Sequence, residues 1–318
     1  SSHPAHCAEV GSHGSDRLMG NADQQKPTVF LIDSSVFVFR SYYSMSTDLV
    51  DANGDSNHAV YGFARFLCRF IKQTQPQYIA TAFDESLSTS FRNEIYPPYK
   101  ANRDPAPEDL KKQFVHCRKL AELMGISVFA DTSYEADDLI GTLHQTYADR
   151  GHKVCVVSAD KDLAQLVRPN DWWWDYGKSK PLDFDALTEK FGVRPDQVCD
   201  FLALAGDAVD NIPGVKGVGT KTAQILLKHF NDLDTLLARH HEIGHLRFRG
   251  AKSCQLKIKQ QQEQARLSKL LSKIVLDAPL DNDDIIKSKV SHEPLIAFIE
   301  SMNFGPMLRR ELLEAATV

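Results

Sequence analysis

Val29-Phe-Leu-Ile-Asp33 is a run of four apolar residues that stops at an aspartate. Two later runs end in a similar way, since Tyr78–Phe83 is followed by Asp84, and Val154–Val157 is followed by Ser158-Ala-Asp160. Apolar runs of this length, bounded by polar residues, are typical of buried strands. The three runs therefore predict a sheet whose strands carry carboxylates at their ends.

Helical patterns lie between these runs at residues 58–74, 108–124 and 135–150. A further short strand is expected at residues 127–130. Alternating strands and helices predict an α/β fold with a central, mostly parallel sheet and helices on both faces. Beyond Phe184 the pattern is almost entirely helical. We therefore expect an α/β core at residues 27–183 and a helical region at residues 184–318.

The composition is that of an ordinary globular protein and excludes several classes. The 318 residues are 42% hydrophobic and 25% charged, and no apolar run approaches the roughly 18 residues of a membrane span. The six cysteines include no Cys-x-x-Cys pair, which argues against a disulfide framework or a zinc site and indicates a reducing, cytoplasmic compartment. Residues 1–26 lack a signal-peptide pattern, and we interpret them as a disordered leader or a cloning scar with a candidate start at Met19.

Nine acidic residues stand out by their positions at strand ends, at the start of the helix expected at 135–150, and in closely spaced pairs. They are Asp33, Asp84, Glu135, Asp137, Asp138, Asp160, Asp162, Asp207 and Asp210. Each alone has an ordinary explanation, because loops favour aspartate and helix N-termini favour acids. Together they predict a cluster outside the carboxyl ends of the strands that repels itself without cations. Hard oxygen ligands without His or Cys indicate Mg²⁺ or Mn²⁺.

The spacing of these acids predicts how they come together. Glu135 with Asp138, and Asp207 with Asp210, are expected on one face of a helix, and Asp160 with Asp162 on one side of an extended segment. The net charge of the chain is −5, from 37 basic and 42 acidic residues. Without these nine acids the net charge of the other residues would be +4, so the rest of the protein is mildly basic.

A glycine-rich string at residues 212–223 reads Ile-Pro-Gly-Val-Lys-Gly-Val-Gly-Thr-Lys-Thr-Ala. Glycines let backbone N–H groups approach a phosphate, and the N-terminus of the helix that follows favours an anion. A plain tight turn between helices is the simpler alternative. The full string predicts a helix–hairpin–helix at about 206–230 that grips a duplex backbone without reading its sequence.

Residues 86–107 interleave basic and aromatic side chains, among them Arg92, Tyr99, Lys100 and Arg103. Grooves that bind single-stranded nucleic acid have this composition, although a solvated surface loop has it too. Trp172-Trp-Trp174 is a second aromatic feature. Three consecutive tryptophans cannot share one face of any element, so at least one is expected to be exposed, packed under a loop in preference to stacking on a base.

These motifs together resemble the 5′ nuclease superfamily of flap endonucleases, and most closely the 5′→3′ exonuclease domains of bacterial DNA polymerase I. The resemblance runs from about Thr28 to Phe230 and more loosely to Leu313. Its pieces are Leu31-Ile-Asp-Ser-Ser35, Ala82-Phe-Asp-Glu85, the segment from Phe91-Arg92 through Tyr99-Lys-Ala-Asn-Arg103, Tyr134-Glu-Ala-Asp-Asp138, Ser158-Ala-Asp-Lys-Asp-Leu163, and Gly206-Asp207 through Gly219.

The resemblance implies a PIN-like 5′ nuclease core, a helical arch at about 85–110, and a helical DNA-binding region with a hairpin of the H3TH type. It also implies two Mg²⁺ ions, with Mn²⁺ able to substitute. Asp33, Asp84, Glu135, Asp137 and Asp160 would crowd one ion; Asp162, Asp207 and Asp210 would serve the second, and Asp138 would be an outer ligand. A K⁺ ion at the hairpin is implied as well.

Catalytic roles are implied for Asp33 and Asp160 and for the basic residues of the arch segment, Arg92, Lys100 and Arg103. The residues expected to contact DNA are Phe39, Arg40, Tyr99, Gly214, Lys216, Gly217, Gly219, Lys221 and Thr222. Phe39 stands where relatives often carry a tyrosine that stacks on a base, and phenylalanine keeps that stacking face.

The implied activity is hydrolysis of DNA phosphodiesters at a 5′ flap, nick or free 5′ end, which leaves 5′-phosphate and 3′-hydroxyl ends during replication or repair. The expected protein is a monomer in the bacterial cytoplasm, associated with the nucleoid, with an organelle as the alternative. Three other functions stay open: a non-catalytic module that binds flaps or branches, a nuclease directed at RNA primers, and a phosphohydrolase of small esters. The intact acids argue against the first, and the hairpin against the third.

Overall fold

The computed structural model describes residues 25–85 and 90–318. The sheet has five strands in the order β3-β2-β1-β4-β5, and every neighbouring pair is parallel. The strands are β1 (Val29–Asp33), β2 (Tyr78–Ala82), β3 (Ser127–Phe129), β4 (Val154–Val157) and β5 (Trp172–Trp174). The parallel sheet expected from the apolar runs is confirmed, and the interpretation of residues 1–24 lies outside the described part of the chain.

Helices cover both faces of the sheet, which is why its central strands are apolar on both sides. Leu31 faces one apolar core, and Ile32 faces the other. The first core includes residues of α6 (Ala136–Asp149), α7 (Phe184–Phe191), α8 (Val198–Ala205) and α9 (Thr220–Phe230). The second includes residues of α2 (Ser34–Ser44), α3 (His58–Thr74), α5 (Glu108–Leu123), α13 (His292–Ser301) and α14 (Pro306–Ala315).

The fifth strand, β5, is the three-tryptophan segment and was not expected from the sequence. Because side chains alternate along a strand, Trp173 joins the first core, whereas Trp174 lies in the second and Trp172 packs against it. The Trp173 and Trp174 indole N–H groups donate to the carbonyls of Asp160 and Ser179. The expectation of an exposed tryptophan is wrong, since Trp172 is half-buried and the other two are buried. The expectation that they pack is correct.

The expected helical arch is only partly helical. Between residue 90 and the start of α5, the structure describes a single helix, α4 (Phe91–Ile95), followed by turns that end in a bend at Arg103. Pro97, Pro98 and Pro105 account for this, because proline removes a backbone donor and restricts the residue before it. The residues at 86–89 lie outside the described part of the chain.

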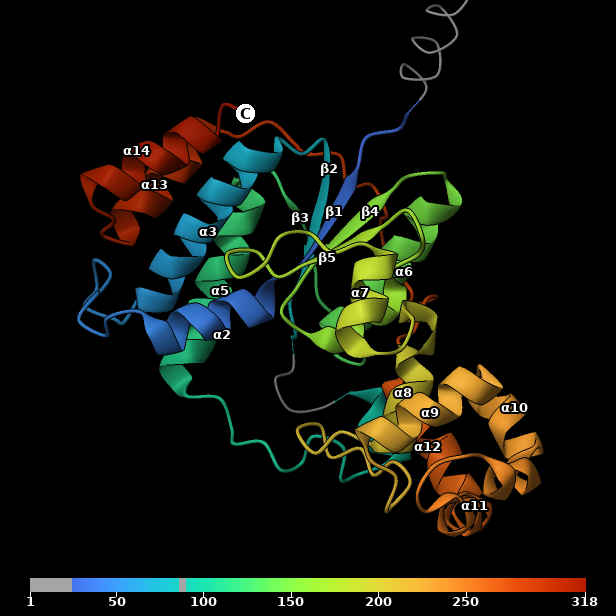
Figure 1. Cartoon of the computed structure of the whole chain (residues 1–318). Helices are drawn as coiled ribbons and strands as arrows, with labels where there is room; N and C mark the ends of the chain where they lie inside the picture. The colour runs from blue at the N-terminus through green and yellow to red at the C-terminus, as the bar shows by residue number, and fades with distance from the viewer. Residues whose placement is uncertain (1–24, 86–89) are drawn as a thin grey trace, which may run out of the picture.

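The helices between α7 and α13 form a second lobe, seen at the lower right of Figure 1. It contains α8, α9, α10 (Leu233–Ala238), α11 (Ala251–Gln260) and α12 (Gln262–Ser272). Residues 273–291 then return to the core without a helix, and the Ile79 N–H donates to the Ile285 carbonyl. The last two helices, α13 and α14, lie beside α3 and α5, so the region at 184–318 does not stay apart from the core.

Candidate active site

The carboxyl ends of β1 and β2 bring Asp33 and Asp84 to one edge of the sheet. Asp33 pairs in register with Ala82, two residues before Asp84. The buried Asp33 carboxylate accepts a hydrogen bond from the Ser158 hydroxyl at 2.9 Å. The Asp84 carboxylate accepts from the Ala136 N–H at 2.9 Å, which fixes it against the start of α6.

The first turn of α6 holds the next group of acids. Glu135 is the N-cap of this helix, and the Asp138 carboxylate accepts from the Glu135 N–H at 3.1 Å as part of a capping box. The expectation that these two acids share one side of a helix start is confirmed. Asp137 is half-buried on the same turn.

The third group of acids comes together through turns, which corrects two expectations about local structure. Asp160 is the N-cap of a 3₁₀ helix at Lys161–Leu166, and its carboxylate accepts from the Asp162 N–H at 2.9 Å. Asp207 and Asp210 lie in a tight loop after α8, closed by a bridge between Asp207 and Ile212, and not on a helix. Gly206, whose φ of 73° favours glycine, ends α8 just before them.

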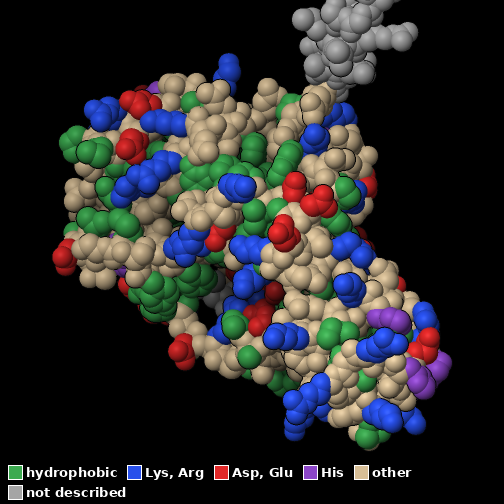
Figure 2. Space-filling model, viewed as in Figure 1, with side chains coloured by type: hydrophobic (Ala, Val, Ile, Leu, Met, Phe, Trp, Pro, Cys, Tyr) green, Lys and Arg blue, Asp and Glu red, His purple; other side chains and the backbone are tan. Residues whose placement is uncertain are grey.

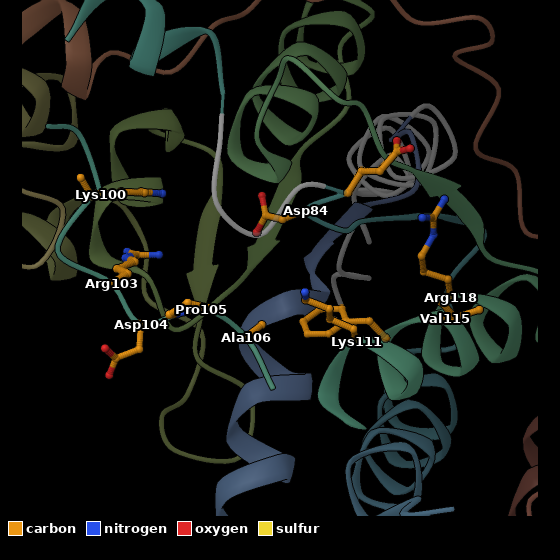
Figure 3. A pocket seen from close by; sticks show the side chains of 12 residues that line it. Asp84, Lys100, Arg103, Asp104, Pro105, Ala106, Lys111, Val115 and Arg118 are labelled. Atoms are coloured by element: carbon orange, nitrogen blue, oxygen red, sulfur yellow. The ribbon is translucent and has the colours of Figure 1, made fainter. Parts of the chain in front are cut away.

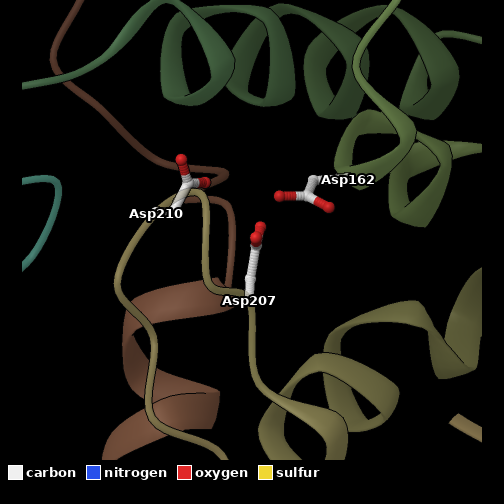
Figure 4. Close-up of side chains that lie close together, drawn as sticks. All are labelled: Asp162, Asp207 and Asp210. Atoms are coloured by element: carbon white, nitrogen blue, oxygen red, sulfur yellow. The ribbon is translucent and has the colours of Figure 1, made fainter. Parts of the chain in front are cut away.

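Asp162, Asp207 and Asp210 face a common space in Figure 4. One carboxylate oxygen of each lies within 4.8 Å of the others. They are the only set of three possible ligands at this spacing in the described residues 25–85 and 90–318. An all-oxygen donor set of this kind suits a hard divalent cation.

Acids from all parts of the cluster lie close enough to raise one another's pKa values. Burial, then the neighbouring Asp84 and Asp160 charges, raise the pKa of Asp33 well above its usual value. Burial, then Asp160 and Asp33, raise the pKa of Asp137 in the same way. Burial and the carboxylates of Asp160, Asp210 and Asp207 raise the pKa of Asp162 to about 8. The cluster therefore favours added positive charge.

One lysine and one arginine of the 96–103 segment already supply part of that positive charge. The Lys100 ammonium donates to Glu135 at 2.5 Å, and Arg103 forms an ion pair with Asp210. Although burial opposes it, the charges of Lys100 and Arg92 hold the pKa of Glu135 below its usual value. Lys100 and Arg103 also line a cavity of about 670 Å³, opposite Lys111 and Arg118 of α5 (Figure 3).

Arg92 is not placed to contact a substrate, which corrects its expected catalytic role. It is 2% exposed, and all five of its N–H donors are occupied inside the protein. The acceptors are both Asp138 oxygens, a Glu135 oxygen and the carbonyls of Leu271 and Lys273. Arg92 therefore holds the start of α6 to the end of α12, and Asp138 acts through Arg92 and backbone N–H groups.

Three residues expected to contact DNA have other partners. Tyr99 is 4% exposed and its hydroxyl donates to Glu135 at 3.1 Å, so its ring is not available to a base. Arg40 forms a forked ion pair with Asp175 at 2.9 and 3.3 Å. Phe39 is half-buried and packs edge-on against Phe114, which lines the cavity, so it alone keeps part of its ring near that space.

The glycine-rich hairpin joins α8 to α9 and makes a helix–hairpin–helix, as expected. Gly214 and Gly217 have φ of 62° and 89°, values that side chains disfavour. The N–H groups of Gly214 and Lys216 donate to Ser268 and Gln261, which removes them as phosphate donors. Within the described part of the chain, the N–H groups of Gly217 and Gly219 have no partner. Lys216 and Lys221 are exposed beside them, whereas Thr222 is half-buried.

The lobe around the hairpin is strongly basic. Residues 214–273 contain twelve Lys and Arg against four Asp and Glu. Figure 2 shows basic side chains spread over the visible face of this lobe. The acidic side chains gather at the edge of the sheet and the basic ones on the helical lobe. This separation fits a polyanion bound by the helical lobe and cations bound at the edge of the sheet.

Sequence reasoning missed the polar residues that orient the acids. Ser158 bonds Asp33 and also accepts from the Asp160 N–H at 2.9 Å, and Ser35 accepts from the Asp84 N–H at 3.1 Å. Both serines lie within two residues of a cluster aspartate, inside the motifs themselves. That adjacency was the available signal, because a buried carboxylate needs hydrogen-bond donors.

Two models of one protein family match this chain. The family described as "5'-3' exonuclease, N-terminal resolvase-like domain" matches residues 28–192, and "5'-3' exonuclease, C-terminal SAM fold" matches residues 193–292. The chain belongs to the 5′-3′ exonuclease family. The family expected from the motifs is thereby confirmed. None of the helices in the described ranges combines the length and apolar character that a membrane crossing needs.

The chain is similar both to a relative of nearly its own length and to much longer relatives. A "5'-3' exonuclease" of Buchnera aphidicola is 33% identical over 284 residues, 88% of this chain and 98% of that protein. "DNA polymerase I" of Rhizobium leguminosarum is 36% identical over 291 residues, 89% of this chain and 28% of that protein. The chain spans about a third of the length of the curated DNA polymerases it matches.

Solved structures share the fold at low sequence identity. The T5 D15 protein co-crystallised with metal ions has a TM-score of 0.63 at 17% identity, with 91% of this chain and 99% of that chain covered. The catalytic core of Rad2 in complex with a DNA substrate has a TM-score of 0.60 at 13% identity, covering 96% of this chain and 100% of the other. These likenesses confirm the sheet with its helical region.

The raised pKa values of the acids predict a pH-dependent response to Mg²⁺. Asp162 has an ordinary pKa of 3.8 and a folded pKa of about 8, so the metal-free protein loses this group's stabilising contribution as pH rises between those values. A divalent ion requires deprotonated ligands and binds only the folded cluster. We therefore expect the Mg²⁺-induced rise in Tm to be larger at about pH 9 than at about pH 6.

The measurement is thermal unfolding with and without Mg²⁺ across that pH range. The control replaces Mg²⁺ with NaCl at equal ionic strength, because salt screens repulsion without binding. A rise in Tm of equal size at all pH values would contradict a carboxylate site with raised pKa values.

Proposed function

We propose that the chain is a structure-specific 5′ nuclease that hydrolyses DNA phosphodiesters with two divalent metal ions, Mg²⁺ or Mn²⁺. The observation that carries the proposal is the set of Asp162, Asp207 and Asp210, with oxygens within 4.8 Å, beside the buried acids of the strand ends. These ligands suit a hard divalent cation, because every candidate is a carboxylate and the nearby basic side chains do not balance the negative charge of the set.

The acids divide between two ions in this proposal. Asp33, Asp84, Glu135, Asp137 and Asp160 would hold one ion, and Asp162, Asp207 and Asp210 the other. When bound, the ions supply Lewis-acid stabilisation of phosphate oxygens and activation of a bound water. Asp138 takes no part as a direct ligand, since its oxygens are used by Arg92 and by the N–H groups of Glu135 and Val275.

In this proposal, Lys100 and Arg103 stabilise the phosphate while the acids hold the ions. Both contact carboxylates of the cluster and both line the cavity next to Asp84. With Glu135 and Asp210 neutralised by bound metal, the Lys100 and Arg103 side chains would be free to reach a phosphate in the cavity. There they would stabilise the charge that develops on the phosphate during displacement. The products would be a 5′-phosphate and a 3′-hydroxyl.

The substrate proposed is DNA with a 5′ flap, a nick or a free 5′ end, held by a monomer. The basic lobe with its exposed hairpin fits a duplex backbone, and the cavity under the 96–106 segment fits a single strand that enters beside it. A K⁺ ion at the hairpin belongs to the same proposal; the Gly217 carbonyl already lies 3.5 Å from the Lys257 ammonium. We place the protein at the nucleoid of a bacterial cell, with residues 27–183 as nuclease core and 184–318 as DNA-binding region.

The experiment compares four end-labelled substrates of one sequence: a 5′-flap duplex, a nicked duplex, a single strand, and a duplex whose 5′ strand begins with RNA. Preference for the flap or nick, with 5′-phosphate products, supports the proposal. A preference for the RNA-containing strand would favour the primer-directed alternative. Tight binding of the flap without cleavage in Mg²⁺ or Mn²⁺ would favour a non-catalytic binding module.

Replacing Lys221 with alanine tests the hairpin. Lys221 is exposed in the first turn of α9, so its loss should weaken duplex binding without moving the cut. The slope of log K against log salt should fall by about 1, as for one lost phosphate contact. The control is Lys72→Ala, which removes a lysine paired with Glu314 on the far side of the core. A shifted cut site would contradict a purely anchoring hairpin.

A further inference from the structure

The turn at residues 96–103 is bonded directly to the loop that carries Asp207 and Asp210. The Lys100 N–H donates to the Asp210 carbonyl at 2.8 Å. The Asn211 side-chain amide donates to the Pro98 carbonyl at 2.7 Å, and the Asn102 amide donates to the Ala208 carbonyl at 3.0 Å. These three hydrogen bonds, together with the Arg103–Asp210 ion pair, join two segments that lie more than a hundred residues apart in the sequence.

The backbone at this junction is strained on both sides. Lys100 and Asn211 have φ of 52° and 60°, in the left-handed region that most side chains avoid. Such conformations persist only where their surroundings hold them, and they concentrate at functional sites. Asparagine tolerates this region better than other side chains because it bonds locally, and here Asn211 uses its amide to reach across the junction.

The same turn is also bonded to the acids of the core. The Lys100 ammonium and the Tyr99 hydroxyl both donate to Glu135, at 2.5 and 3.1 Å. The Asn93 amide, from α4, donates to the Tyr99 carbonyl at 2.7 Å. The turn thus contacts Glu135 on one side and the Asp207–Asp210 loop on the other, and it spans the two groups of carboxylates.

We infer that the 96–103 turn is a strut that sets the spacing between these two groups, with Asn211 and Asn102 as positioning residues. Neither side chain is a carboxylate ligand, and each acts through the backbone that carries Asp207 and Asp210. Asn211 is half-buried and its bond is 2.7 Å long, whereas Asn102 is exposed and its bond is 3.0 Å long, so we assign the larger part to Asn211. This inference rests on the proposed function, because the spacing matters through divalent ions.

The variant that isolates the amide is Asn211→Gly, because glycine keeps the left-handed backbone and removes only the side-chain bond. We expect faster hydrogen exchange at the Lys100 amide, whose acceptor is on the released loop. We also expect the midpoint of Mg²⁺ binding to the protein without DNA, measured by titration calorimetry, to increase about tenfold, as for other residues that orient metal ligands. The Mg²⁺ midpoint of flap cleavage should move by the same factor, with the rate largely recovered at saturating Mg²⁺.

Two further variants make the result decisive. Asn303→Gly is the matched control, since Asn303 also has a left-handed φ of 56° but bonds the Val50 carbonyl far from the acids; it should change neither midpoint. Asn102→Ala, at an exposed position that tolerates substitution, should move both midpoints in the same direction by less. Unchanged Mg²⁺ midpoints in Asn211→Gly and Asn102→Ala would overturn the inference. A wild-type protein that fails to cleave the flap would instead contradict the proposed function, while the calorimetric and exchange measurements would still test the strut.

Discussion

Replacing Asp160 with asparagine is expected to abolish cleavage and to leave the fold and DNA binding intact. Asparagine keeps the oxygen that caps the 3₁₀ helix through the Asp162 N–H, so local structure should persist. It removes one charge from a cluster in which burial raises the pKa of Asp160. Loss of a partner that only orients a metal ligand costs about 10- to 100-fold, and loss of a ligand should exceed that range.

The measurement is single-turnover cleavage of a flap duplex in Mg²⁺, with Tm and duplex affinity determined in parallel. Asp183→Asn is the matched control, because Asp183 caps α7 through the Ala186 N–H and lies outside the acid cluster. It should cleave at the wild-type rate. Retained turnover in Asp160→Asn would contradict the assignment of Asp160 as a metal ligand.

Replacing Arg92 with methionine is expected to destabilise the whole protein. The substitution leaves the buried Asp138 carboxylate without its guanidinium and two carbonyls without donors. Breaking a buried ion pair from one side costs about 3–5 kcal/mol. For a chain of this size, such a loss corresponds to a fall in Tm of roughly 5–10 °C. Arg92→Lys should recover only part of this, since an ammonium cannot reproduce the five-donor fork.

Thermal and denaturant unfolding provide the measurement, and Arg150→Met provides the control. Arg150 pairs with Asp283 at the surface, with both side chains 48% exposed, so its loss should cost less than about 1 kcal/mol. If Arg92→Met lost activity while keeping wild-type stability, the residue would contact the substrate after all, as its place in the arch segment suggested.

The regular elements of the core could be predicted from the sequence because their signals are local. The apolar runs at β1, β2 and β4 and the amphipathic pattern of α3 appear within a few residues of their observed bounds. The strand β5 could not be predicted in the same way, because three tryptophans carry no alternation and their burial depends on both cores. The course of residues 273–291 depends on pairing with Gln77 and Gly125, which lie more than a hundred residues away.

In the candidate site, the sequence indicated which residues take part but not how the chain places all of them. The nine acids were found because their positions exceed what caps and turns need, but the turns that bring Asp160, Asp207 and Asp210 together were expected to be extended or helical. Arg92 and Tyr99 were expected to contact the substrate because of the family resemblance and because basic and aromatic residues on a loop suggest an exposed groove. Their burial is decided by α12 and by Glu135, contacts that no pattern within residues 86–107 records.

The most direct test of the account is cleavage of a 5′-end-labelled flap duplex by the wild-type protein, with and without Mg²⁺, beside Asp160→Asn. The account predicts a Mg²⁺-dependent cut at or near the junction of single strand and duplex, with a 3′-hydroxyl on the released flap, and no cut in the variant. Cleavage without divalent metal, or cleavage that the variant retains, would contradict the metal-dependent nuclease site at the carboxyl edge of the sheet.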